Sequence, residues 1–164
     1  MANKKISIYA LIVIIIAVLS VFGAGCAKRG TIEPDYSKVV AEDFLAAVSA
    51  SDYDSVSAVI SEDFKKSLKS MINTATGKEY TSEKEAFADK ICKPINEKIG
   101  KYEKGSLSFV KTLSEKGCTS VFYKSEYSKE AQGDVTVQFV YEESEGKMLV
   151  GGIWFSSKTL KQQG

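Results

Sequence analysis

The chain has 164 residues, a length that allows one domain behind a leader segment but not two domains of ordinary size. It contains 22 basic and 21 acidic residues, which give a formal charge of +1. Without residues 1–25 the chain keeps 20 basic and 21 acidic residues, a balance that disfavours binding of nucleic acid through a basic surface. The absence of histidine excludes imidazole as catalytic base, catalytic acid or metal ligand.

The N-terminus has the features of an export signal. Two lysines precede an apolar run from Ile6 to Phe22, and three small residues then lead into Cys26. The pattern resembles a bacterial-type lipoprotein signal peptide, which implies removal of residues 1–25 and acylation of Cys26. The alternative is an uncleaved transmembrane anchor, since an apolar run of about 17 residues just spans a bilayer. Both readings predict a domain held at the cell membrane on its extracytoplasmic face.

Residues 26–35 are polar and are predicted to form a flexible tether, followed by a single α+β domain over residues 36–160. Apolar residues at helical spacing predict two helices over residues 37–49 and 52–60, and a third from Ser61. Ser37 is a candidate N-cap of the first helix.

A longer helix is predicted over residues 82–99. Ser82 has the sequence context of a capping box, and Gly100 is a natural C-terminal stop. Pro94 lies inside this helix, so we expect it to kink the helix or split it in two.

The C-terminal half predicts a curved antiparallel meander of four strands with the helices on one face. The expected strands are Ser106–Leu113, Thr119–Tyr127, Asp134–Glu142 and Lys147–Phe155. The last strand is apolar on both faces, which predicts that it lies inside the sheet and is covered on both sides. Its two adjacent glycines, Gly151 and Gly152, predict a bulge or sharp bend.

The order of these elements resembles the nuclear transport factor 2-like (cystatin-like) superfamily over residues 37–158. The resemblance rests on three places in the chain. They are Phe44–Ala47 followed by Ser51–Asp54, then Ile99–Tyr102, and last the ending made of Val135–Tyr141, Gly146–Lys147 and Val150–Phe155. It implies a cone-shaped cavity between the sheet and the helices. It also implies that some relatives are isomerases or dehydratases with an Asp and a His or Tyr in the cavity, and that a homodimer formed through the sheet is a reasonable expectation.

Apart from Cys26, the chain has two cysteines, Cys92 and Cys118. An even pair in an extracytoplasmic domain predicts a disulfide. Two buried thiols or a redox site are the alternatives, although Cys92 is not part of a Cys-x-x-Cys motif. Two thiols are too few for a zinc site, so we predict no metal and no cofactor.

Four aromatic residues in the predicted strands are candidates for lining the concave face of the sheet: Tyr123, Tyr127, Tyr141 and Trp154. They could offer hydroxyl and indole donors to a ligand. The alternative is that they belong to the core, with their polar tips bonded to backbone or water.

These patterns contain no catalytic constellation. They favour a non-catalytic, membrane-anchored domain of the cell envelope that binds a small hydrophobic ligand or an envelope protein. One alternative is a small-pocket isomerase or dehydratase that pairs tyrosine hydroxyls with Glu126 or Glu142. Another is an accessory domain that docks onto a membrane protein through an exposed apolar patch.

Overall fold

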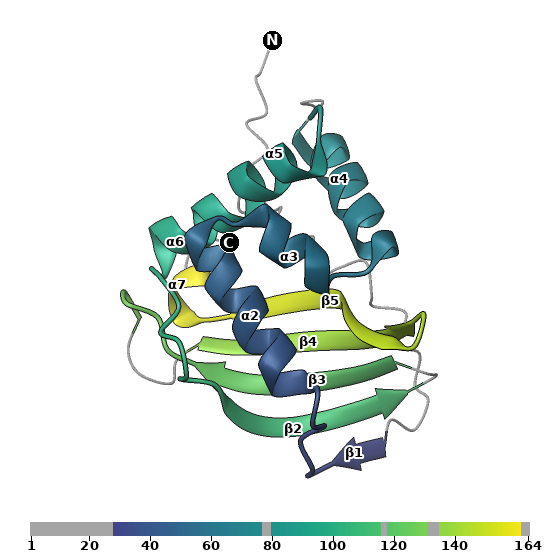
Figure 1. The fold of residues 1–164 in the computed structure, drawn as a ribbon. Helices are drawn as coiled ribbons and strands as arrows, with labels where there is room; N and C mark the ends of the chain where they lie inside the picture. The colour runs from purple at the N-terminus through teal and green to yellow at the C-terminus, as the bar shows by residue number, and fades with distance from the viewer. Residues whose placement is uncertain (1–27, 77–79, 116–117, 131–134, 162–164) are drawn as a thin grey trace.

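The computed structural model describes residues 28–76, 80–115, 118–130 and 135–161. It is an α+β fold in which helices cover one face of an open antiparallel sheet, as predicted (Figure 1). The strands follow one another in chain order across the sheet. They are β1 (Lys28–Gly30), β2 (Ser108–Glu115), β3 (Cys118–Ser125), β4 (Val135–Ser144) and β5 (Lys147–Ser156).

The first strand corrects the prediction of a flexible tether over residues 26–35. Lys28 pairs with Ser114 and Gly30 pairs with Thr112, so β1 adds a fifth strand to the four that were expected. The edge of β2 carries unpaired N–H and C=O groups, which a short extended segment satisfies. The flanking residues 26 and 27 lie outside the described part of the chain.

The last strand confirms one prediction and corrects another. Val140 pairs with Gly152 whereas Tyr141 pairs with Val150, so Gly151 is the extra residue of the expected β-bulge. However, β5 lies at the edge of the sheet and not inside it. Part of that edge is covered, because the N–H of Ser61 donates a 3.0 Å hydrogen bond to the carbonyl of Val150.

The helices follow the predicted order. They are α2 (Ser37–Ala50), α3 (Tyr53–Val59), α4 (Glu62–Thr76), α5 (Glu83–Phe87), the π-helix η1 (Ala88–Cys92), α6 (Lys93–Lys98) and α7 (Lys158–Lys161). Ser61 and Ser82 cap α4 and α5 by accepting hydrogen bonds from the N–H groups of Phe64 and Glu85. Ser37 is not the N-cap that was predicted: it is the first residue of α2 and is fully buried.

Pro94 accounts for the π-helix. Proline has no N–H to donate to the carbonyl four residues earlier, and its ring collides with that carbonyl. The chain widens immediately before it: the N–H of Lys93 bonds to the carbonyl of Ala88, five residues back. The predicted split is therefore observed as a junction of α5, η1 and α6.

The core lies between the helices and the inner face of the sheet. Helix α2 crosses in front of the sheet in Figure 1, and the ring of Phe44 meets Phe139 of β4 edge to face at 5.6 Å. Phe44 meets Phe87 of α5 in the same way at 6.4 Å, so one side chain joins α2 to two other elements. Among the described residues, no helix is both long enough and apolar enough to cross a membrane. The apolar run before Cys26 lies outside them.

Candidate functional site

Three of the four predicted pocket residues fill the space between the helices and the sheet. Tyr123 and Tyr141 are completely buried, and Tyr127 is 3% exposed. The Tyr123 hydroxyl lies 2.7 Å from the Oγ of Ser37, and the Tyr141 hydroxyl donates a 2.7 Å hydrogen bond to the carbonyl of Ser37. These tyrosines hold the first turn of α2 onto the sheet and are closed to a ligand from outside.

The raised pKa values of these tyrosines also indicate a structural role. Burial raises the pKa of Tyr123, Tyr127 and Tyr141 well above the ordinary value for tyrosine. Burial also raises the pKa of Tyr102, whose hydroxyl donates a 2.6 Å hydrogen bond to Glu42. A neutral, enclosed phenol serves as a structural donor, whereas a catalytic base needs a lowered pKa and access to substrate.

Trp154, the fourth predicted pocket residue, belongs to the opposite face of the sheet. It pairs with Gln138, which pairs with Phe122, which in turn pairs with Lys111. Directly opposed residues share a face of an antiparallel sheet, so these four form one row across β5, β4, β3 and β2. All four are half-buried, and the Lys111 ammonium lies 4.5 Å from the centre of the Phe122 ring. The sequence predicts the strand of Trp154 correctly, but the structure places this side chain on the outer face and not on the concave face for which it was a candidate. Because β5 is apolar on both faces, its sequence pattern does not distinguish them.

A second row lies beside the first on this outer sheet face. Leu113 pairs with Ser120, Ser120 with Val140, and Val140 with Gly152. Val140 is only 4% exposed, yet it is not a member of the helix-side core. The outer sheet face therefore has a small apolar centre of its own, flanked by the aromatic row.

The two glutamates proposed for an enzyme are not brought together with the buried tyrosines. Glu142 pairs with Leu149 and lies against Gly151, where an added Cβ would come within 2.7 Å of the Glu142 side chain. Glu126 follows the end of β3, and its N–H donates to the Oγ of Ser106. The predicted pairing of tyrosine and carboxylate is thus not assembled within the inner core.

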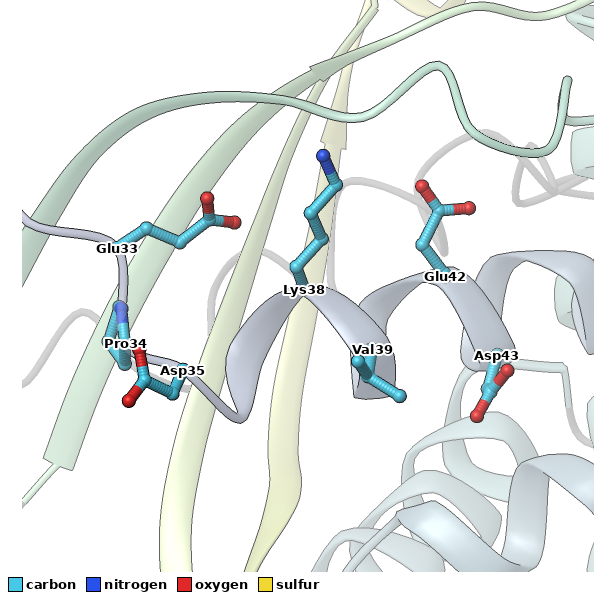
Figure 2. Close-up of a pocket in the computed structure, with 7 residues that line it drawn as sticks. All are labelled: Glu33, Pro34, Asp35, Lys38, Val39, Glu42 and Asp43. Carbon is cyan, nitrogen blue, oxygen red and sulfur yellow. The ribbon is translucent and has the colours of Figure 1, made fainter.

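An open groove of about 510 Å³ runs along the first turns of α2 and the segment before it (Figure 2). Its lining consists of Glu33, Pro34, Asp35, Lys38, Val39, Glu42 and Asp43. Glu42 is already engaged, because it accepts hydrogen bonds from Tyr102 and from the N–H of Gly105. The groove was not predicted from the sequence. The feature that could have indicated it is the presence of four carboxylates within the eleven residues 33–43.

The predicted disulfide is not present, because Cys92 and Cys118 are free thiols in the structure. Cys92 lies beside Ser51, the C-cap of α2. Cys118 is adjacent in sequence to Thr119, which lies beside Tyr36 at the N-cap of α2. A helix of 14 residues is about 21 Å long, and a disulfide needs Cα atoms within about 7 Å. The two cysteines therefore lie at opposite ends of α2.

The described residues contain no group of three or more cysteine, aspartate or glutamate side chains placed to hold a metal ion. The predicted acylation site, Cys26, lies outside them. The arrangement thus offers a filled interior, an acidic groove and a half-exposed aromatic row. Comparisons of the chain with protein-family models, curated proteins and solved structures found no match.

Proposed function

We propose that this protein is a membrane-anchored domain of the cell envelope that binds a partner protein through the outer sheet face. The observation that carries the proposal is the row of Lys111, Phe122, Gln138 and Trp154. Tryptophan and phenylalanine are enriched at the centres of protein interfaces, and tryptophan is among the residues whose truncation costs most binding energy. The helices pack against the inner face, whose buried tyrosines and phenylalanines form the core.

The anchor is the lipid-modified Cys26 that the N-terminal sequence predicts, with the domain on the extracytoplasmic side of the cell membrane. The fold is proposed to be a variant of the nuclear transport factor 2-like (cystatin-like) architecture. Its cavity would be closed by Tyr123, Tyr127 and Tyr141, which are buried. This closure favours interaction over either a small hydrophobic ligand or isomerase chemistry, because both would need an open interior.

Site-specific photo-crosslinking in the producing cell tests the proposal. A photoreactive amino acid at Gln138, between Phe122 and Trp154, should give one discrete crosslinked product. The substitution Trp154→Ala should reduce its yield sharply, since a hot-spot truncation of about 2 kcal/mol or more weakens binding roughly thirtyfold.

Matched controls separate the surface from the fold. A photoreactive residue at Thr81, which is exposed near α5, should give no such product. Val39→Ala, a truncation of an exposed apolar residue on α2, should leave the Gln138 product unchanged. A product with twice the mass of the chain would identify the partner as a second copy. A Gln138 product that persists in Trp154→Ala, or the lack of any product, would contradict the proposal.

A further inference from the structure

Two exposed apolar side chains lie near the edge of the sheet where β1 pairs with β2. Among the described residues, the large apolar side chains that are strongly exposed are Ile32 at 81%, Val39 at 64% and Val110 at 47%. Ile32 follows β1, and Val110 is the residue at which the register between β2 and β3 shifts. Isolated apolar residues on a surface need no explanation, but neighbours on one edge do.

Ile32 and Val110 both lie along this edge. The β1–β2 ladder ends at the pair of Gly30 and Thr112, and Val110 precedes Thr112 by two residues on β2. The hydroxyl of Thr112 donates a 3.1 Å hydrogen bond to the carbonyl of Ile32 and fixes the segment there. The edge made by Ile32 and Val110 is called the β1 edge below.

The β1 edge is tied closely to the predicted anchor. Cys26 and Lys28 are separated by a single residue, and an extended chain advances at most about 3.6 Å per residue. An acylated Cys26 would therefore hold the start of β1 within about 7 Å of the residue that carries the acyl chains. Because β1 is paired in the sheet, the folded domain has almost no slack with which to move away from the bilayer.

We propose that the β1 edge rests on the bilayer surface, with Ile32 and Val110 in contact with the headgroup–acyl boundary. This inference rests on the proposed anchoring at Cys26. The occupant of the edge is the phospholipid bilayer. The short connection to the predicted anchor holds the edge at the membrane surface, where exposed apolar side chains gain free energy by leaving water for the headgroup–acyl boundary. Figure 1 places β1 and the α4–α5 pair at opposite ends of the molecule, so the α4–α5 end projects away from the membrane.

Depth-dependent quenching of tryptophan tests this orientation. The full-length protein is produced in acylated form and reconstituted into vesicles of phosphatidylethanolamine and phosphatidylglycerol that carry brominated acyl chains. The single native tryptophan is replaced by Trp154→Phe, and a new one is introduced by Ile32→Trp or, as a second probe, Val110→Trp. Both sites are solvent-exposed, so either substitution should leave the fold intact.

Emission from both probes should fall at least twofold in brominated vesicles relative to unbrominated ones. Thr81→Trp, introduced in the same background at the opposite end of the molecule, should be unaffected. Insertion of twenty Gly/Ser residues between Cys26 and Lys28 should restore the emission of the Ile32→Trp probe at least in part. Equal emission in the two vesicle types at Ile32 and Val110 would overturn the proposal.

Mass spectrometry of the mature chain and flotation of the vesicles distinguish a wrong orientation at the membrane from a wrong membrane anchor. If the chain is acylated at Cys26 and floats, but neither probe is quenched, the orientation is wrong and the anchoring stands. If the chain is not acylated and does not float, the anchor is wrong and the orientation falls with it.

Discussion

The hydroxyl of Tyr141 donates a 2.7 Å hydrogen bond to the main-chain carbonyl of Ser37, a residue 104 positions earlier in the chain. Tyr127 lies on the same inner side of the sheet and is also buried. Its hydroxyl, in contrast, has no hydrogen-bond partner within the part of the chain that the structure describes. The two buried tyrosines therefore differ in whether the polar atom is compensated.

This difference predicts opposite effects of the same substitution. Tyr141→Phe should lower the free energy of unfolding by about 1 kcal/mol, because it removes a satisfied buried hydrogen bond. Tyr127→Phe should leave that free energy unchanged or raise it, because it removes a buried hydroxyl that has no partner. Urea unfolding at neutral pH measures both variants. Equal destabilisation by the two would show that the Tyr127 hydroxyl is bonded in solution, for example to a buried water molecule.

The buried tyrosines also predict a loss of stability in alkali. Burial raises the pKa of Tyr127 in the folded state above its unfolded value near 10. Below pH 10 the phenol is protonated in both the folded and the unfolded state, so its contribution to the free energy of unfolding is fully present. Above pH 10 the unfolded state loses the proton first, so the contribution falls by about 1.4 kcal/mol per pH unit for each such tyrosine. The free energy of unfolding measured between pH 9 and 11 should fall less steeply in Tyr127→Phe than in the wild type, and identical slopes would contradict the assignment.

Two glycines with nearly the same positive φ but different surroundings give a matched pair. Gly100 has φ of 88° and Gly105 has φ of 86°. A Cβ on Gly100 would collide with the Oγ of Ser128, whereas a Cβ on Gly105 would meet nothing within 4 Å. Gly105→Ala should therefore cost only the backbone strain, about 1 kcal/mol, and Gly100→Ala should cost clearly more. Thermal and urea unfolding of both variants test this, and equal costs would mean that the contact with Ser128 relaxes without penalty.

The two free thiols should differ in reactivity. Cys92 is buried, and burial raises its pKa to about 12, so its reactive thiolate is scarce at neutral pH. Cys118, at the start of β3, is half-buried. Iodoacetamide at pH 8 should therefore modify Cys118 in the native protein and Cys92 only after denaturation, as read from peptide masses. A mass showing Cys92 and Cys118 joined would instead restore the disulfide predicted from the sequence.

Features that depend only on residues close together in the sequence were predictable. The bulge at Gly151 followed from paired glycines in a strand, and the break before Pro94 followed from the missing N–H of proline. The caps at Ser61 and Ser82 depend on residues only three positions away.

Features that depend on distant partners were not predictable. Strand β1 forms because it pairs with the edge of β2, whose residues come more than 80 positions later in the chain. The three residues of β1 carry no sequence pattern that predicts a strand. The apolar residues of β5 predict a central strand, but β5 lies at the edge of the sheet. An edge strand with an apolar outer face has the same sequence pattern. The hydroxyls of Tyr123 and Tyr141 could have been ligand donors until the position of Ser37 was known.

The pairing of β1 with β2 also dictates an order of events as the chain is made. Lys28 is synthesised 86 residues before its partner Ser114, and closing so long a loop costs entropy that local contacts cannot offset. Docking of helix α2 onto the sheet comes later still, since its first turn is held by a hydrogen bond from Tyr141. A nascent chain that stops before β2 therefore has no template for its first strand, and that strand takes its place in the sheet only after β2 has been synthesised.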